Sequence, residues 1–276
     1  MVTLPAVAIL GAGSMGGAIL AGLLAPGVTV DGGIRVTNRS EAKAAALRRP
    51  GVTSLSAESD PQANSVAVRG AHIILIAVKP AMVPDVLREI AEVLEPDAIL
   101  VSVAAGVTTA TMEALVPPTV AVLRAMPNTP ATVRRGVTGV SAGTRATSEH
   151  LDLVTRLFET VGKVVVVPEA RIDALSTISG SGPAYVFFLI EELTKTAVSM
   201  GFSEADADTL VTTTFLGASE LLEASGSTPG ELRRKVTSPN GTTERAIAVL
   251  EAADLNAIFD RATAAALRRA RELSRE

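Results

Sequence analysis

Short apolar runs alternate with amphipathic, helix-like stretches from residue 6 to about residue 167. This alternation is typical of βαβ units, which build a parallel sheet. The run Ile73–Val78 is apolar at every position, as expected for a central strand with helices on both faces. The other predicted strands cover residues 7–10, 34–37, 99–103, 120–124, 137–141 and 164–167, and helices are predicted over residues 41–49, 82–94 and 148–160. The pattern therefore predicts an α/β fold.

The pattern changes after Pro168. Strand-like runs disappear, and the rest of the sequence reads as helices separated by capped turns. Pro183 suits the first turn of one such helix, because proline is favoured there. We therefore predict an α/β domain over residues 1–167 and an all-helical domain over residues 168–276.

The helix that Pro183 opens is apolar on every side along Tyr185–Ile190. A helix of this kind is buried on more than one side. A small helical domain could cover it alone only if the helix were central, and a subunit interface would cover it otherwise. A subunit interface is therefore one of two ways in which this segment could be covered.

A glycine-rich loop follows the first predicted strand and opens a helix. Gly11, Gly13 and Gly16 have the spacing of the dinucleotide-binding fingerprint in the strand-turn-helix context that the fingerprint requires. The first glycine permits a tight turn, the second lets the backbone approach a pyrophosphate, and the third allows close helix packing. The helix N-terminus adds amide donors for the phosphates. The alternative is a glycine-rich turn or a small-residue packing face, but the context favours NAD(P) binding on a doubly wound, Rossmann-type sheet.

The end of the second strand bears on which cofactor is bound. About 20 residues after the fingerprint, an acidic residue usually binds the ribose 2′-hydroxyl, but here the sequence reads Asn38-Arg39-Ser40. Arg39 can hold a 2′-phosphate through charge-assisted hydrogen bonds, with Asn38 and Ser40 as further donors. This favours NADPH, with NADH as the alternative. A solvated surface arginine is the competing interpretation.

Two more loops follow strands at the edge where open α/β sheets bind ligands. Val78-Lys79-Pro80 follows one strand, and small residues over 102–106 follow the next. Small side chains allow a flat ring to approach, and Lys79 could bring an ammonium group near the ribose or nicotinamide. A surface charge at a strand end explains Lys79 equally well.

Composition excludes several classes of function. The chain has no cysteine and two histidines, which disfavours a thiolate nucleophile and a metal centre, so no metal is expected. The net charge of −4 argues against nucleic-acid binding, which needs a basic surface. The first 30 residues lack charge, but they also lack a basic n-region and are interrupted by Pro5 and several glycines, so we expect neither export nor a membrane anchor. A cytoplasmic protein with a small-molecule ligand is the expectation.

A hydroxyl-rich loop over residues 237–243 separates two predicted helices and ends where a helix begins, near Thr243-Glu244. The amides of such a helix N-terminus can bind a carboxylate, and a threonine hydroxyl offers one more donor. Taken alone, the loop is more often a simple helix cap.

Together these residues resemble the pyrroline-5-carboxylate reductase family, and the resemblance covers nearly the whole chain. The first of the matching segments is common to many dehydrogenases, whereas the last three in this order are distinctive. The segments are residues 11–18, Val78-Lys79-Pro80, residues 124–131, residues 173–185 and residues 236–243.

The resemblance implies NAD(P)H-dependent reduction of the cyclic imine Δ1-pyrroline-5-carboxylate to L-proline, the last step of proline biosynthesis. It also implies a Rossmann domain followed by a helical dimerisation domain, with a homodimer that in some members forms larger rings of dimers. The implied substrate contacts are Ser238, Gly241, Thr242 and Thr243. The implied cofactor contacts are Gly11, Ala12, Gly13, Ser14, Met15, Gly16, Asn38, Arg39, Ser40, Asn64, Val78, Lys79, Pro80, Ala104, Ala105 and Glu169.

A cyclic imine needs little from the protein beyond orientation, a donor at nitrogen and an anchor for its carboxylate. Our hypothesis is that the amides of residues 241–243 hold the carboxylate and that the Thr243 hydroxyl, as the catalytic group, hydrogen-bonds the ring nitrogen. One residue departs from the family pattern, since Asn240 stands where a glycine is common. Asn tolerates left-handed backbone better than other non-glycine residues, so the turn can survive.

Three alternatives remain. A β-hydroxyacid dehydrogenase would use a lysine soon after the glycine-rich segment that starts the interdomain helix, but no lysine follows Gly182 until Lys195. An imine reductase with another cyclic substrate is the second alternative. A non-catalytic, nucleotide-sensing protein is the third, and the hydroxyl-rich loop speaks against it only through the resemblance.

Overall fold

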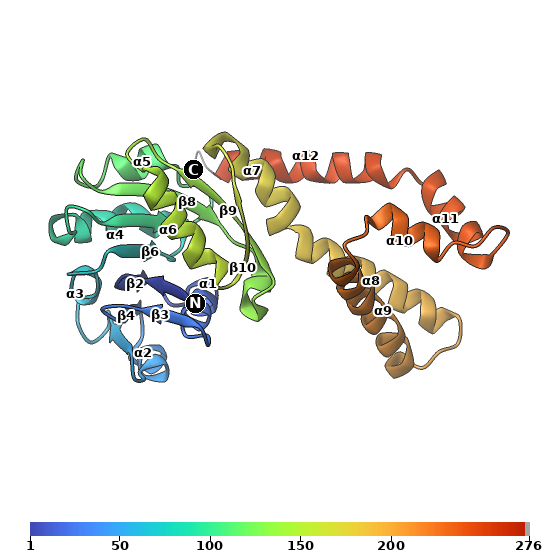
Figure 1. The fold of residues 1–276 in the computed structure, drawn as a ribbon, viewed down its shortest axis with the longest axis horizontal. Helices are drawn as coiled ribbons and strands as arrows, with labels where there is room; N and C mark the ends of the chain where they lie inside the picture. The colour runs from blue at the N-terminus through green and yellow to red at the C-terminus, as the bar shows by residue number, and fades with distance from the viewer. Residues whose placement is uncertain (274–276) are drawn as a thin grey trace. The chain divides into compact units, whose positions relative to one another are not determined.

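The structure, a computed structural model, describes residues 1–273, and within them an eight-stranded sheet forms the core of the first part of the chain (Figure 1). All seven predicted strands are present. From one edge to the other the strands are β10 (Gly162–Val166), β9 (Gly136–Ala142), β8 (Ala121–Met126), β7 (Ile99–Ser102), β6 (Ile73–Ile76), β2 (Val7–Leu10), β4 (Ile34–Asn38) and β5 (Val52–Ser56).

Three strands were not predicted. β1 (Val2–Leu4) and β3 (Val28–Val30) pair in parallel as a separate two-stranded sheet, and β5 forms one edge of the main sheet. β1 and β3 have only three residues each, and β5 alternates with serine and threonine, so none of them stands out as an apolar run.

The sheet is parallel except at one place, where β9 runs antiparallel to β8. The βαβ pattern predicted a parallel sheet and did not indicate this one antiparallel pair. A parallel crossover needs a dozen or more residues, but β8 and β9 are joined only by residues 127–135, which include the short 3-10 helix η3 (Thr129–Val133). β10 then pairs in parallel with β9.

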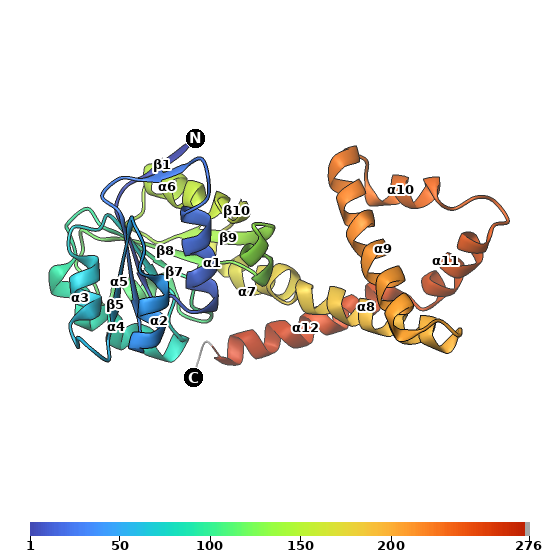
Figure 2. The same cartoon turned by 90° about the horizontal axis from the view of Figure 1, so that it is seen from below.

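Alternate residues of each central strand face opposite layers of helices. Val7 and Ile9 of β2 pack in one apolar cluster with α1 (Ser14–Leu23) and α6 (Ser148–Glu159). Ala8 and Leu10 pack in a second cluster that includes residues of α3 (Ala63–Val68), α4 (Val83–Ile90) and α5 (Thr109–Glu113). Figure 2 shows the sheet between these layers. Helices on both faces explain why the central strands are apolar at every position.

The order of the strands creates a ligand-binding edge. β2 lies between β4 and β6, so the direction of strand succession reverses at β2. In open α/β sheets ligands bind beyond the carboxyl ends of the strands at such a switch point. Leu10 pairs with Thr37 and Ile76, and Ile76 pairs with Ser102, so the loops after four neighbouring strands start level with one another.

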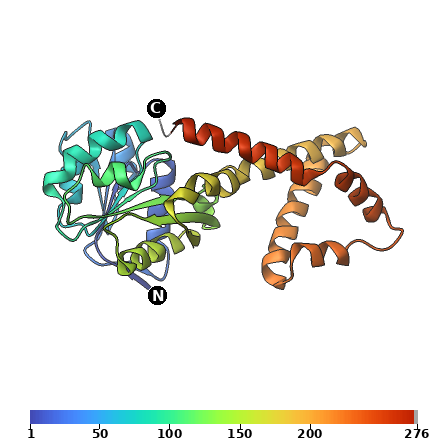
Figure 3. The same ribbon diagram turned by 90° about the horizontal axis from the view of Figure 1, so that it is seen from above.

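The described residues divide into two compact units, one of residues 1–181 with residues 266–273, the other of residues 182–265. After Val166 the described residues form helices and turns (Figure 3). The helices are α8 (Gly182–Ser199), α9 (Glu204–Ser225), α10 (Pro229–Lys235), α11 (Thr242–Ala252) and α12 (Leu255–Leu273). The other short helices are α2 (Glu41–Leu47), η1 (Pro80–Met82), η2 (Ala91–Val93), η4 (Glu169–Arg171), α7 (Ile172–Leu175) and the π-helix η5 (Ser176–Gly180).

Helix α8 has no buried residue, although it is the most apolar helix of its unit. Phe187 and Phe188 are 65% and 59% exposed. Much of the apolar surface that the sequence pattern predicted to be covered is therefore exposed within residues 1–273.

Candidate functional site

Two glycines of the loop between β2 and α1 are required by the fold itself. Gly11 has a φ of +95°, and a Cβ there would lie 2.9 Å from the carbonyl oxygen of Ala77. A Cβ at Gly16 would lie 2.5 Å from the carbonyl oxygen of Gly11. Any side chain at either position would push the turn away from β6 or the helix away from the turn. The tight turn and the close helix packing predicted for these two glycines are therefore both present.

Gly13, in contrast, is not required by close contacts within the protein. Its φ of −79° lies outside the left-handed region, and a Cβ there would meet no protein atom within 4 Å. Gly13 is exposed and stands at the N-terminus of α1, which no side chain caps. A bare backbone at the positive end of a helix fits a pyrophosphate. Ser14 and Met15 continue the helix from this point.

A chain of hydrogen bonds holds the glycine-rich loop in place. The amides of Gly11 and Ala12 donate to the carbonyl oxygen of Thr37 at 3.2 and 2.9 Å. The Thr37 hydroxyl donates to Asn64 Oδ1 at 2.8 Å, and Asn64 Nδ2 donates to Glu89 Oε2 at 3.0 Å. Asn64 was expected to contact the cofactor only through the resemblance. The structure shows in addition that Asn64 supports the loop, and sequence reasoning assigned no role to Thr37 or Glu89.

Asn38, Arg39 and Ser40 lie at the end of β4, level with the glycine-rich loop. Asn38 is buried, and its Nδ2 has no hydrogen-bond acceptor in the protein. Arg39 is exposed, and within residues 1–273 its guanidinium has no ion pair or hydrogen bond. Ser40 precedes α2, but its hydroxyl does not cap that helix. All three side chains therefore have donors that the protein leaves unused.

The carboxylates nearest to Arg39 in sequence have other partners. Glu41 pairs with Arg48 at 2.6 Å, and Glu58 accepts a hydrogen bond from the Glu41 amide. The hydrogen bond from Arg48 is the largest cause that lowers the pKa of Glu41, so this carboxylate stays ionised and paired. Glu41 and Glu58 therefore do not neutralise Arg39.

The two loops on the other side of β2 follow β6 and β7, which are neighbouring strands. Val78 is half-buried, whereas Lys79 and Pro80 are exposed. After β7, Ala104 is buried and donates its amide to the buried Ser102 hydroxyl at 3.2 Å, and Ala105 is exposed. These loops and those carrying Gly11 and Asn38 thus share one edge of the sheet.

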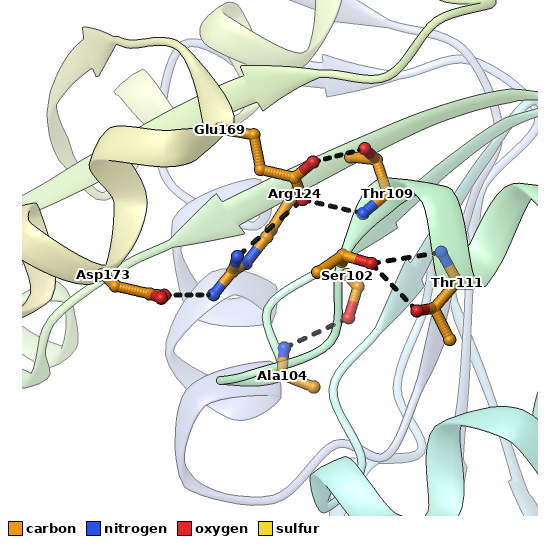
Figure 4. Close-up of polar contacts among 8 residues, drawn as sticks. Ser102, Ala104, Thr109, Thr111, Arg124, Glu169 and Asp173 are labelled. Carbon is orange, nitrogen blue, oxygen red and sulfur yellow. Dashed lines mark hydrogen bonds and ion pairs between the residues drawn. The ribbon is translucent and has the colours of Figure 1, made fainter. Parts of the chain in front are cut away.

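Glu169 is tied to the end of the β7 loop (Figure 4). Its carboxylate accepts hydrogen bonds from the Thr109 amide at 2.7 Å and the Thr109 hydroxyl at 2.6 Å. Arg124 lies 3.8 Å from the same carboxylate and 2.9 Å from Asp173. Sequence reasoning assigned no role to Thr109, Arg124 or Asp173. The signal in the sequence that could have identified this group was Arg124, a charged residue in the otherwise apolar strand β8.

The loop between α10 and α11 belongs to the second unit. Asn240 has a φ of +60°, so it adopts the left-handed conformation expected of the residue that replaces glycine. Its amide donates to Glu244 Oε2 at 3.0 Å, and the Gly241 amide donates to the Ser238 carbonyl oxygen at 3.0 Å. A Cβ at Gly241 would lie 3.0 Å from that same oxygen. The turn is therefore kept despite the substitution.

Helix α11 begins directly after this turn with its N-terminus uncapped by any side chain. Thr242 is exposed and Thr243 is half-buried. Within residues 1–273, neither hydroxyl has a hydrogen-bond partner. The helix N-terminus and the two hydroxyls thus form a group of donors that could receive a carboxylate and one further acceptor.

Lys195 does not have the character of a catalytic lysine. It is exposed and lies 2.8 Å from both Glu191 and Glu192. Hydrogen bonds to these two carboxylates raise its pKa, so the amine stays protonated. In the described part of the chain, no group of His, Asp and Glu side chains has the arrangement of a metal site. None of the helices within residues 1–273 has both the length and the hydropathy to cross a bilayer.

Two family descriptions match the chain. Residues 6–106 match the family described as NADP oxidoreductase, coenzyme F420-dependent. Residues 169–273 match the family described as pyrroline-5-carboxylate reductase dimerisation. The first match covers the glycine-rich loop and the strands β2 to β7, and the second covers the helices from η4 onward.

Individual relatives resemble the chain over nearly its whole length. A pyrroline-5-carboxylate reductase of Corynebacterium melassecola is 38% identical over 273 residues, 98% of each chain. The solved structure of a pyrroline-5-carboxylate reductase from Coxiella burnetii is 36% identical, with a TM-score of 0.89 over 97% of both chains. The pyrroline carboxylate reductase of Plasmodium falciparum, solved with NADP bound, is 25% identical with a TM-score of 0.80 over 97% of both chains.

Proposed function

The chain belongs to the pyrroline-5-carboxylate reductase family, and from this membership we propose how its residues reduce Δ1-pyrroline-5-carboxylate to L-proline. The protein is an oxidoreductase, and its first unit binds NAD(P) on a Rossmann-type sheet. The observation that carries the proposal is Gly13, which stands exposed at a helix N-terminus where a Cβ would meet no protein atom within 4 Å. The reaction adds a hydride to the imine carbon and a proton to the ring nitrogen.

The cofactor, when bound, supplies the hydride from its nicotinamide ring. In this proposal the loop from Gly11 to Gly16 receives the pyrophosphate, and residues 38–40 receive the adenosine ribose. The loops after β6 and β7, with Val78, Lys79, Pro80, Ala104 and Ala105, receive the nicotinamide half. This division is supported by the strand order, because β4 and β6 flank β2 on opposite sides. Glu169 remains a predicted contact at the same edge.

For the substrate we propose the donors at the start of α11. The amides of residues 241–243 hold the carboxylate, Ser238 shapes the turn that presents them, and the Thr243 hydroxyl hydrogen-bonds the ring nitrogen. Orientation and a donor at the atom that gains electrons are what an imine reduction requires. The uncapped helix N-terminus and the unpaired Thr243 hydroxyl support this assignment.

The preference between the two cofactors rests on Arg39. No carboxylate occupies the position that normally binds the ribose 2′-hydroxyl of NAD. Arg39, whose guanidinium the protein leaves unpaired, and Asn38, whose buried Nδ2 lacks an acceptor, both suit a 2′-phosphate. We therefore propose that NADPH is preferred and that NADH is the weaker substrate.

We expect Arg39→Met to reduce kcat/KM for NADPH by about tenfold to a hundredfold, as for loss of one or more charge-assisted hydrogen bonds. The value for NADH should change by less than about twofold, because NADH lacks the 2′-phosphate that Arg39 binds. The measurement is NADPH and NADH oxidation followed by absorbance with Δ1-pyrroline-5-carboxylate. Arg49→Met, at another exposed arginine, serves as the control. Equal losses with both cofactors would contradict the assignment.

The same assay tests the reaction itself. Rapid turnover with either cofactor supports reduction of pyrroline-5-carboxylate. No turnover in a folded protein that binds NADPH would instead favour another cyclic imino acid.

The domain assignment that we propose gives cofactor binding to residues 1–167, and dimerisation and the substrate loop to residues 168–276. We propose the cytoplasm as the site of action.

We propose a homodimer, which in turn could assemble into a larger ring. The match of residues 169–273 to a dimerisation family supports self-association. The uncovered apolar surface of α8 supports it independently, because apolar surface of this extent marks an interface. In this proposal a second copy of the chain covers the apolar surface of α8.

We expect Phe187→Asp to give monomers, because the substitution places a carboxylate at each copy of an apolar contact. Sedimentation velocity at micromolar concentration should report the mass of one chain, whereas the unmodified protein sediments as a dimer or larger. Val133→Asp is the matched control, since Val133 is 68% exposed but lies in the first unit. A Phe187→Asp protein that keeps the unmodified mass would remove α8 from the interface.

A further inference from the structure

Arg124 is a buried cation at the carboxyl edge of the sheet. It is 4% exposed and lies in β8, paired with Ser102, the last residue of β7. Its guanidinium lies 2.9 Å from Asp173 Oδ1 and 3.8 Å from Glu169 Oε1 (Figure 4). Burial of a charge is costly unless partners of opposite charge surround it. Arg124 is thus held in place by two carboxylates from the segment that follows the sheet.

The link from Arg124 continues to the loop after β7. Both oxygens of Glu169 accept hydrogen bonds from Thr109, one from its amide and one from its hydroxyl. At the other end of that loop the Ser102 hydroxyl accepts a hydrogen bond from the Ala104 amide. The loop from Ser102 to Thr109 is therefore fixed at both ends, and the exposed Ala105 lies between the fixed points.

We propose that Arg124 is a positioning residue for hydride transfer, acting through Glu169 and Thr109 on the loop against which the nicotinamide ring binds. This inference rests on the proposed function, because it takes the β7 loop as the nicotinamide half of the cofactor site. In this proposal Arg124 contacts neither cofactor nor substrate. It sets the position of the loop, and a displacement of about 1 Å at a reacting centre can slow a reaction a hundredfold.

The effect of Arg124 should be confined to one half of the cofactor. β7 and β8 lie on the β6 side of β2, whereas residues 38–40 follow β4 on the other side. A planar guanidinium can serve two carboxylates at once, which a lysine ammonium reproduces only in part. Loss of Arg124 should therefore loosen the nicotinamide half and leave the adenosine half intact.

The test compares Arg124→Met and Arg124→Lys with the unmodified full-length protein. Two ligands separate the halves of the site, NADPH and adenosine 2′,5′-bisphosphate, which carries only the adenosine half. We expect Arg124→Met to bind adenosine 2′,5′-bisphosphate within about twofold of the unmodified protein, while kcat falls about tenfold to a hundredfold. Arg124→Lys should recover part of kcat.

The isotope effect identifies the slowed step. With NADPH deuterated at both C4 positions, the effect on kcat in Arg124→Met should be at least as large as in the unmodified enzyme, because hydride transfer is the step that the variant slows. A merely structural role would lower the melting temperature without this pattern. Arg88→Met is the matched control, since Arg88 pairs with Asp85 at 2.7 Å on the exposed surface of α4.

A second variant covers the case in which Arg124→Met does not fold. Thr109→Val removes the hydroxyl bonded to Glu169 Oε2 and leaves the Arg124 ion pairs untouched. It should also lower kcat, by a smaller factor than Arg124→Met does, and leave the binding of adenosine 2′,5′-bisphosphate unchanged. The proposal is overturned if both ligands weaken together, if kcat is unchanged in both variants, or if the isotope effect disappears. Failure of the proposed function would look different, as absence of turnover in the unmodified protein itself.

Discussion

A Gly13→Ala variant should fold normally and yet bind NADPH on the order of a hundredfold more weakly, because a methyl group would hold the pyrophosphate away from the helix amides. The hundredfold corresponds to a loss of about 3 kcal/mol, the lower end for two charge-assisted hydrogen bonds of about 1.5–3 kcal/mol each, since about 1.4 kcal/mol is tenfold in Kd. The methyl group meets no protein atom within 4 Å, so the fold itself gives no reason for instability. Fluorescence titration with NADPH and a melting curve measure the two quantities.

Two neighbouring glycines provide the controls for this experiment. Gly17→Ala also adds a methyl group in open space, but inside α1, where alanine stabilises a helix by up to about 1 kcal/mol relative to glycine. It should keep NADPH affinity. Gly16→Ala, which would meet the Gly11 carbonyl oxygen at 2.5 Å, should lose both stability and affinity. If Gly13→Ala binds NADPH as tightly as Gly17→Ala, the pyrophosphate does not lie against Gly13.

Thr243→Ala should lower kcat/KM for Δ1-pyrroline-5-carboxylate by about a hundredfold to a thousandfold, the loss typical of one preorganised donor at a reacting centre. The Thr243 hydroxyl has no protein partner in the described residues, so its removal leaves no buried group unsatisfied. Stability and NADPH binding should therefore be unchanged. Steady-state kinetics at saturating NADPH give the result.

Thr243→Ser separates the hydroxyl from the methyl group of the side chain. Serine keeps the donor, so most of the activity should return. Thr237→Ala is a useful comparison, since the Thr237 hydroxyl already donates to the Arg233 carbonyl oxygen at 2.6 Å and serves the end of α10. Unchanged kinetics in Thr243→Ala would remove Thr243 from the mechanism, and the ring nitrogen would then need another donor.

Much of the fold could be predicted from local patterns. The apolar runs identified seven strands, of which β2, β6 and β7 are buried at every position, and Pro168 marked the end of the sheet-forming sequence. The edge strand β5 was missed because serine and threonine occupy three of its five positions, including the buried Ser54 and Ser56. The antiparallel direction of β9 was not predicted, because it depends on the length of the connection after β8 and the apolar pattern carries no information about that length.

The candidate site shows the same difference between local features, which could be predicted, and long-range contacts, which could not. Gly11, Gly13 and Gly16 could be identified because their spacing is itself the chemical requirement. The supporting contacts could not, because they join residues far apart in the chain, such as Thr109 with Glu169 or Asn64 with Glu89. The left-handed conformation of Asn240 was predictable from the tolerance of asparagine for positive φ. Its hydrogen bond to Glu244 required the structure.

No residue of helix α8 is buried within residues 1–273, so in the proposed dimer the second copy would supply much of the apolar contact that stabilises this helix. Folding and association are then one equilibrium governed by mass action. The melting temperature of the protein should rise with its concentration, and dilution should unfold the helical unit without heat or denaturant. Abundance in the cell would thus set how much of the enzyme exists in an active form, before any regulator acts on the site.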